Sequence, residues 1–365
     1  AFPQGNFPYF PLRALIAIAG SLLAVVIFLI AALLYRNIWF ATLSASFVVF
    51  DNALIVYSRT ILPEMLLLLF GFSGILCWIL SDQAKHETNE NMRGEQKHWL
   101  VVWGLFLIAA VLWALAASMK LTGLGFLLTA SLFLLYRKQY AKLIAAWAMF
   151  ALVYSAVFFI FFSTIKDSTI PYTHFRNQAI QKIDFSTPKT LTNFIPFFIQ
   201  HHRATLVAHT EVPTDPAIHP LRWPLYHRSI GFWGTSNSER INVSGNMVIW
   251  TSTTLAVLVA LVMVTLKKFK YSAAPFPIPT LPLIGYLANY VPFVFVPRAL
   301  YLYHYFAALI FGFLLLPALV QFFASLAVDK SSQRKKIALA LILCAILWYI
   351  LLIPRTYGVP FYSIL

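Results

Sequence analysis

Long apolar runs, each close to the length of a membrane-spanning helix, constrain the fold of this chain more than any other feature. Residues 12–34, 61–80, 99–117 and 337–353 are examples, and a helix of roughly 20 residues crosses ~30 Å of hydrocarbon. Backbone groups in a bilayer must be hydrogen-bonded within the protein, which a single segment achieves only as a helix. Charged residues make up 11% of the chain, against about a quarter in soluble domains. The sequence therefore predicts an all-α polytopic membrane protein.

Ten apolar segments can be delimited, with breaks at Pro63 and near Lys120. They are residues 12–35, 38–56, 61–80, 99–117, 121–136, 143–165, 246–266, 279–297, 301–324 and 337–353. We therefore expect three parts: six spans in residues 1–165, an extramembrane region in residues 166–245 and four spans in residues 246–365. Because the sequence begins at Ala1, with neither an initiator methionine nor a signal peptide, we also expect residues upstream of it.

Basic residues outnumber acidic ones by 27 to 12, and their positions indicate orientation rather than nucleic-acid binding. Every second connection is rich in cations: Arg36; Lys85, Arg93 and Lys97; Arg137, Lys138 and Lys142; Lys267, Lys268 and Lys270; and Lys330, Arg334, Lys335 and Lys336. The other short connections and the ends contain only Arg13, Arg59, Lys120, Arg298 and Arg355. The positive-inside rule places the first set in the cytoplasm, and residues 166–245 therefore outside.

Four groups of polar residues fall on the external side, where the orientation rule does not explain cations. The first contains Asp51, Arg59 and Glu64. Ionisable groups at membrane depth usually form pairs or line a polar cavity, so this group is either a structural pair, Asp51–Arg59 or Arg59–Glu64, or part of a site. The second is Lys120, which either extends from a helix end to the headgroups or offers its ammonium to a lipid phosphate.

The third group combines aromatic, basic and amide side chains in His219–Arg228 and Asn246. Rings suit the face of a sugar, Arg suits phosphate and an amide suits hydroxyls. An interfacial helix anchored by Trp223 and Tyr226 is the structural alternative. The fourth group is Arg298–Tyr305, whose tyrosines also fit an aromatic belt at the membrane surface.

No metal site and no site for a soluble nucleotide are predicted. The spacings of His201, His202, His209, His219 and His227 match no zinc signature, and carboxylate partners are sparse. Neither a Walker sequence nor GxGxxG occurs.

In these segments the sequence resembles the protein O-mannosyltransferase family of GT-C membrane glycosyltransferases. The matching segments, from about residue 10 onward and in order, are Asp51–Glu64, Ser118–Gly123, His219–Arg228, Gly245–Trp250 and Tyr290–Tyr305. Three departures stand out: Leu121 replaces an aromatic residue, Met247 replaces a proline, and Tyr303 replaces one histidine of a His-His-Tyr sequence.

The resemblance implies a GT-C-like bundle of eleven spans, of which the ten here would be spans two to eleven. The family's first external loop carries an Asp-Glu pair, and the Asp is thought to be the catalytic base. That loop would precede Ala1, so the catalytic residue is expected upstream and is unknown here, with Asp51 as the first candidate within the chain. The short region 166–245 favours a bacterial or archaeal type.

The resemblance further implies inverting transfer of mannose from polyprenyl (dolichyl)-phosphate-mannose to Ser or Thr hydroxyls of secreted or translocating proteins. The residues expected to hold the donor phosphate are Arg59, Lys120, Arg298 and Arg228. Those expected at the sugar and acceptor site are Asp51, Glu64, His219, Trp223, Asn246 and His304. Neither a metal nor another cofactor is expected, because the cations can neutralise a single phosphate.

The expected partners are membrane lipid, the lipid-linked donor, a protein acceptor and a second subunit in a homo- or heterodimer. The expected location is the plasma (inner) membrane with the active face external, or the endoplasmic reticulum in a eukaryote. Three alternatives stay open: a GT-C transferase acting on a lipid or polysaccharide, an inactive family member, and a transporter. The transporter is disfavoured because the chain has no internal repeat and its polar residues cluster at one surface.

Overall fold

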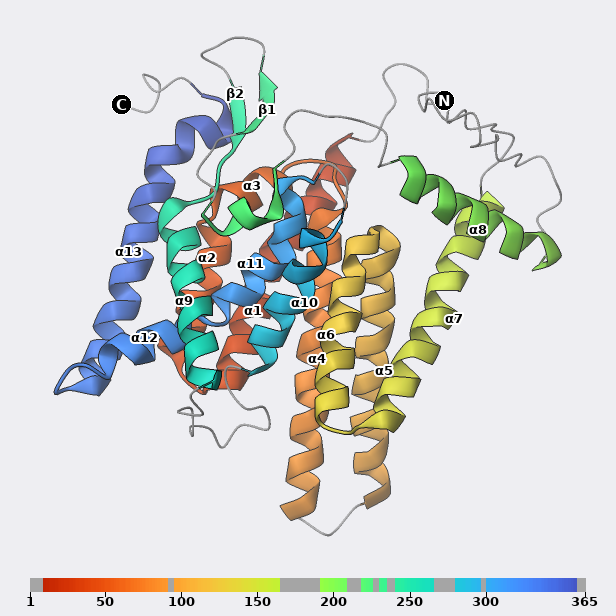
Figure 1. Ribbon diagram of the computed structural model, residues 1–365, viewed down its shortest axis with the longest axis horizontal. Coiled ribbons are helices and arrows are strands. Elements are labelled where there is room, and N and C mark those ends of the chain that lie inside the picture. The colour runs from red at the N-terminus through yellow and green to blue at the C-terminus, as the bar shows by residue number, and fades with distance from the viewer. Residues whose placement is uncertain are drawn as a thin grey trace.

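A computed structural model describes residues 9–90, 95–164, 191–208, 218–225, 230–234, 240–265, 280–296 and 300–359. Helices run side by side as a bundle, and a small β-hairpin projects from one end (Figure 1). The helices are α1 (Tyr9–Tyr35), α2 (Ile38–Val49), α3 (Asn52–Ser58), α4 (Glu64–Glu90), α5 (Glu95–Met119), α6 (Leu124–Tyr136), α7 (Tyr140–Thr164), α8 (Leu191–Ala208), α9 (Met247–Thr265), α10 (Thr280–Val294), α11 (Phe306–Phe313), α12 (Leu316–Ala324) and α13 (Lys330–Tyr357). Short 3₁₀ turns cover Leu121–Gly123, Pro220–Leu225 and Leu302–Tyr305, and the antiparallel hairpin pairs β1 (Ile230–Gly234) with β2 (Arg240–Val243).

The ten apolar segments of the sequence are helical over most of their length. Six helices are long and apolar enough to cross a membrane, or eight if each of two bent pairs counts as one span. Leu121–Tyr136 and Thr280–Val294 are shorter apolar helices. The number, length and apolar character of these helices therefore confirm the prediction of an all-α, multi-pass membrane protein.

Two of the predicted spans are bent, which the hydropathy pattern did not show. α2 and α3 meet at 61°, and the helix Leu302–Phe313 meets α12 at 41°. At the first bend Asp51 has an extended backbone and its side chain accepts the Leu54 N–H, so it caps a new helix. At the second, Pro317 lies in the first turn of α12, where its missing N–H is tolerated.

The core of the bundle is built from large aromatic side chains that meet edge to face or at a tilt. Phe72 of α4 lies 5.0 Å from the Phe126 ring of α6 and 4.8 Å from the Phe311 ring of α11, measured between ring centroids. Trp78 and Trp113, both fully buried, join α4 to α5. A second, smaller cluster around Phe162 joins α7 to α8, which lies across the end of α7 (Figure 1).

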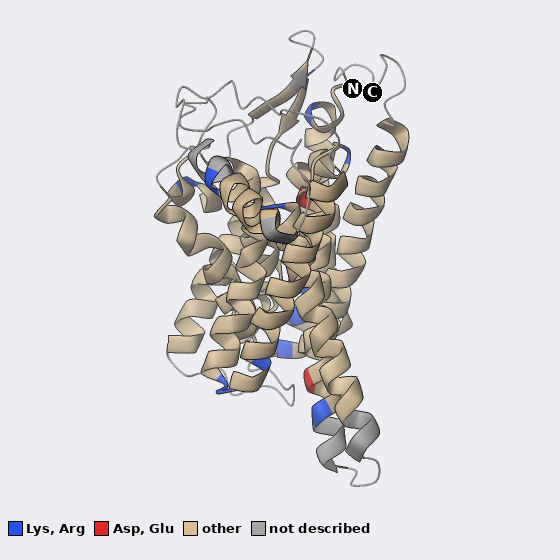
Figure 2. Cartoon of the chain, turned by 90° about the vertical axis from the view of Figure 1, so that its right-hand side faces the viewer, with Lys and Arg blue, Asp and Glu red and all other residues tan. Residues whose placement is uncertain are grey.

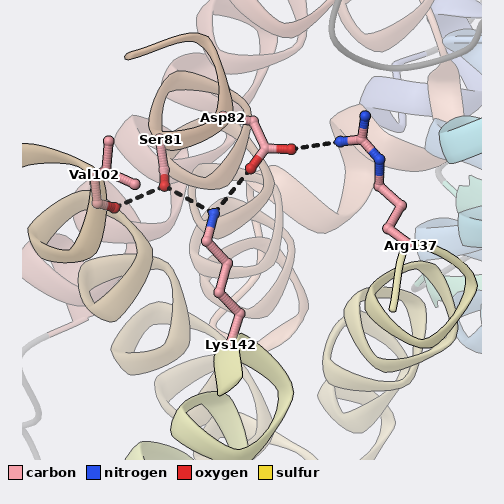
Figure 3. A network of polar contacts seen from close by, with 5 residues as sticks. All are labelled: Ser81, Asp82, Val102, Arg137 and Lys142. Atoms are coloured by element: carbon pink, nitrogen blue, oxygen red, sulfur yellow. Dashed lines mark hydrogen bonds and ion pairs between the residues drawn. The ribbon is translucent and has the colours of Figure 1, made fainter. Parts of the chain in front are cut away.

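Charged residues lie mostly toward the two ends of the bundle (Figure 2). At the end where α4 runs toward α5, the Asp82 carboxylate accepts from Arg137 at 2.7 Å and from Lys142 at 2.9 Å (Figure 3). Lys142 also reaches the Ser81 hydroxyl, which itself donates to the Val102 carbonyl. Asp82 and Lys142 are buried. The orientation rule accounted for these two cations, but the structure shows that they also join α4 to the end of α6 and the start of α7.

Candidate functional site

An ion pair between Glu64 and Lys120 lies at the opposite end of the bundle from Asp82. Glu64 is the first residue of α4, directly after the break at Pro63, and Lys120 lies in extended conformation between α5 and the following 3₁₀ turn. The Lys120 Nζ atom is 2.8 Å from Glu64 Oε1. Glu64 is only 6% exposed, and its second oxygen, Oε2, is buried without a hydrogen-bond partner among the described residues. A buried carboxylate oxygen in this state calls for a donor, either a water or a ligand hydroxyl.

The Lys120 ammonium is held from a second direction by an aromatic ring. Its Nζ atom lies 3.6 Å from the centroid of the Tyr303 ring, within the range of a cation–π interaction. Tyr303 in turn stacks on His304, with 4.4 Å between the ring centroids. Both residues lie in the Leu302–Tyr305 turn that opens α11. The charge of Lys120 is therefore fixed between a carboxylate and an aromatic face that come from distant parts of the sequence.

These side chains line a cavity of about 20 Å³. Its polar lining consists of Glu64, Lys120, Thr122, Asn289, Tyr303 and His304, and its remaining wall is apolar. A cavity of this size holds about one water molecule. A hexose is much larger than one water, so it would enter only after side chains or helices move apart.

Arg59 does not form either of the ion pairs that the sequence suggested. Its guanidinium carbon lies 4.4 Å from the centroid of the Tyr357 ring, and its Nη1 atom donates to the Thr356 carbonyl at 3.4 Å. Glu64 pairs with Lys120 instead. The reason is geometric, since α3 ends just before Arg59 and directs it toward the end of α13. Arg59 is exposed and lies at the same end of the bundle as Lys120, but it does not line the cavity.

Asp51 and Asn246 are fully buried and hold helices together. Asp51 Oδ2 accepts the Trp250 indole N–H at 2.7 Å and the Asn246 N–H at 3.3 Å, while its Oδ1 caps α3. The Asn246 amide donates to carbonyls of Phe50 and Ala345. These contacts join α2, α3, α9 and α13. In this conformation neither side chain reaches the cavity, and the role that the structure shows for both is in packing.

Trp223 lies in the 3₁₀ turn Pro220–Leu225 before the hairpin, and His219 directly precedes this turn. Trp223 is fully buried and lies nearly parallel to His304, at 5° and 6.4 Å between centroids. Its segment is tied down by the Tyr290 hydroxyl, which donates to the Pro220 carbonyl. His219 is exposed at the surface, where its ring accepts the Leu221 N–H. Trp223 therefore packs beside a residue of the cavity wall, while His219 lies at the outer surface.

The structure thus brings Lys120, Glu64 and His304 together. Among the described residues, five other predicted site residues do not line this cavity: Asp51, Arg59, His219, Trp223 and Asn246. Arg228 and Arg298 lie outside the described residues. Asn289, Thr122 and Tyr303 also line the cavity and were not singled out as site residues. Asn289 could have been found from sequence, because it is an amide in the middle of an apolar span. It is 2% exposed and donates to the Gly285 carbonyl and the Thr129 hydroxyl.

Metal ligation gains no support in the described part of the chain, which contains no group of three His, Cys, Asp or Glu residues placed to hold an ion.

Two family models together match most of the sequence. Residues 3–173 match dolichyl-phosphate-mannose-protein mannosyltransferase, and residues 194–363 match the C-terminal four-span region of protein O-mannosyltransferase. Among curated relatives, dolichyl-phosphate-mannose–protein mannosyltransferase 5 of Candida albicans is 28% identical over 226 residues, 54% of this chain and 31% of its own length. Protein O-mannosyl-transferase 1 of Mus musculus is 32% identical over 158 residues, 38% of this chain and 21% of its own length. The matches thus span less than a third of these relatives.

A solved structure has the same fold. It is that of the S. cerevisiae protein O-mannosyltransferase Pmt1-Pmt2 complex bound to the sugar donor. The TM-score is 0.74 at 15% sequence identity, and the match covers 99% of this chain and 80% of that one. At this identity the likeness establishes the GT-C architecture of the bundle.

Proposed function

Because the chain belongs to the protein O-mannosyltransferase family, we propose that it transfers mannose from polyprenyl-phosphate-mannose to Ser or Thr hydroxyls of proteins. The observation that carries this proposal is the Lys120 ammonium, held at 2.8 Å from Glu64 and over the Tyr303 ring in a polar cavity at one end of the bundle. A fixed cation at the end of a membrane bundle is suited to the phosphate of a lipid whose tail lies in the bilayer.

In the proposed reaction the acceptor oxygen attacks the anomeric carbon of mannose from the face opposite the phosphate. The new bond joins this carbon to the acceptor oxygen, and the bond from the carbon to the phosphate oxygen breaks, so the configuration inverts. The polyprenyl phosphate leaves with the bonding electron pair, and Lys120 stabilises the negative charge that develops on it. The proton of the acceptor hydroxyl passes to a carboxylate, which the family resemblance assigns to the Asp of the first external loop.

The resting ion pair means that a donor phosphate competes with Glu64 for Lys120. We propose that the phosphate draws the ammonium toward itself and that Glu64 then accepts hydrogen bonds from sugar hydroxyls. This assignment is supported by Glu64 Oε2, which is buried in the cavity wall without a described donor. Arg59, exposed at the same end, is proposed as a second phosphate contact, together with Arg228 and Arg298. A metal is not needed in this scheme, because the side-chain cations neutralise the phosphate.

The acceptor class decides between this function and a GT-C transferase that acts on a lipid or polysaccharide. Membranes containing the native protein are incubated with polyprenyl-phosphate-mannose labelled in the sugar and with a Ser/Thr-rich peptide. Label is expected in the peptide, and a control peptide with Ala at every Ser and Thr should remain unlabelled. Label that appears in the lipid or polysaccharide fraction and not in the Ser/Thr peptide would contradict the proposal.

We propose that the cavity end of the bundle faces the exterior, or the lumen in a eukaryote, with residues 166–245 on the same side. The bias of cations toward the other end supports this orientation. Single cysteines introduced as Thr235→Cys and Lys268→Cys should differ in intact cells, where an impermeant thiol reagent is expected to label only the first. Labelling of position 268 without position 235 would reverse the orientation.

We further propose that the protein works as a dimer, either with a second copy or with a related chain. The structural neighbour supports this proposal, because it is a complex of two chains, Pmt1 and Pmt2.

A further inference from the structure

A groove of about 390 Å³ lies at the end of the bundle away from the cavity. It runs between the first residues of α2 and those of α13, and Asn37, Trp39, Asp329, Ser332, Arg334 and Lys335 line it. Asn37 and Asp329 cap the two helices: the Asn37 side chain accepts the Trp39 N–H, and Asp329 accepts the Ser332 N–H. Two helices therefore begin at this groove, and the positive ends of their dipoles add to the potential there.

The charge around the groove is strongly positive. Lys330, Arg334, Lys335 and Lys336 all lie in the first two turns of α13, and all four are exposed. Across the described parts of the chain, none of these four has a carboxylate within ion-pair distance. Lys335 is nevertheless held in place, because its Nζ atom lies 4.7 Å from the centroid of the Trp39 ring. Asp329, the one acidic lining residue, is already engaged as a helix cap.

An apolar surface adjoins this basic groove. α12 runs across the lower end of the bundle to the tip from which α13 rises (Figure 1). Phe322, Phe323, Leu326 and Val328 are exposed along this approach, and Leu326 is 75% exposed. Beside the groove, Ile38 at the start of α2 is 61% exposed. Apolar side chains bordering Lys, Arg and Trp are the pattern of a surface at the level of lipid headgroups.

We propose that this groove binds the phosphate headgroup of an anionic phospholipid. Arg334 and Lys335 contact the phosphate, Ser332 donates a hydrogen bond to it, and the acyl chains lie along the exposed face of α12. Basic pockets between transmembrane helices bind lipid headgroups in this way. A free anion would use only the polar half of the surface and leave the apolar half without an occupant, which is why the proposal commits to a lipid. The site is separate from the Lys120 cavity and adds a lipid requirement to the protein.

The distribution of cations permits a test against general attraction to an acidic membrane. The variant Arg334→Gln/Lys335→Gln removes two charges that line the groove. Its matched control, Lys330→Gln/Lys336→Gln, removes two exposed charges from the same helix turns that do not line it. Binding of a short-chain phosphatidylglycerol to the native protein in detergent is followed by the rise in melting temperature. At about 1 kcal/mol per cation, the groove variant should bind about 30-fold more weakly, while the control should change by less than about threefold.

Two other ligands and one further variant complete the experiment. Phosphatidylcholine with the same chains should raise the melting temperature little, inorganic phosphate should not reproduce the effect, and the charge-preserving Arg334→Lys/Lys335→Arg should retain binding. Without lipid, all variants should melt like the native protein, since the side chains are exposed. Equal losses in the two Gln variants would overturn the groove as a site. Equal binding of the two phospholipids would exclude headgroup charge, and binding of inorganic phosphate as tight as that of lipid would exclude the lipid as occupant.

Discussion

Replacement of Lys120 by methionine is expected to lower the rate of the proposed mannose transfer by a factor of about 10² to 10³. Removing one preorganised donor from a developing anion costs about 3–4 kcal/mol in the transition state. Methionine keeps most of the length of the side chain, so the wall of the cavity is largely preserved, while the cation–π contact with Tyr303 is lost together with the charge. The measurement is the rate of sugar transfer from polyprenyl-phosphate-mannose to a Ser/Thr peptide, at several donor concentrations.

A second variant separates this chemical effect from loss of structure. Lys120→Met alone leaves the buried Glu64 carboxylate without its partner, which is itself destabilising. In Lys120→Met/Glu64→Gln no unpaired charge remains, so the melting temperature should return close to that of the native protein while transfer stays low. If transfer recovered together with stability, Lys120 would be a structural residue and the phosphate assignment would be wrong.

Replacement of Asp82 by alanine is expected to lower the free energy of unfolding by about 3–5 kcal/mol. Asp82 is the carboxylate that Arg137 and Lys142 share, and Lys142 is buried (Figure 3). Removing one partner of a buried pair leaves an uncompensated charge in a low-dielectric environment, and this accounts for most of the loss. The measurement is denaturant unfolding in detergent micelles, where the loss should appear as a lower midpoint.

The same network offers an internal control. Replacing all three charged residues with apolar ones of similar size, as Asp82→Leu/Arg137→Met/Lys142→Met, should restore most of the stability, because buried ion pairs and apolar substitutes are often close in free energy. Transfer activity should be retained in this triple variant, since the network lies at the end of the bundle away from Lys120. Native-like stability of Asp82→Ala would show that Lys142 reaches water when its partner is removed, and that the network is not a major source of stability.

The sequence by itself determined which segments are apolar helices, and the charge of their connections predicts which ends share a side. The helices follow from the free energy of transferring an apolar segment into lipid. The predicted sidedness follows from the bias of Lys and Arg between alternate connections. Both depend on local composition and can be obtained from sequence alone. The motifs were likewise sufficient to indicate the family, since they follow one another along this chain in the same order as in the family. Lys120, Glu64 and His304 were found in this way, and the structure brings them to one cavity.

Only the tertiary structure decided which charged side chains meet. Glu64 is five residues from Arg59 but pairs with Lys120, fifty-six residues away, because α3 ends at Ser58 and directs Arg59 toward Tyr357. Asp51 looked like a polar residue at the edge of a site, yet the bend between α2 and α3 directs it to the Trp250 indole inside the core. The partner of a side chain depends on the rotation and bend of two helices that are distant in sequence, and hydropathy carries no information on either.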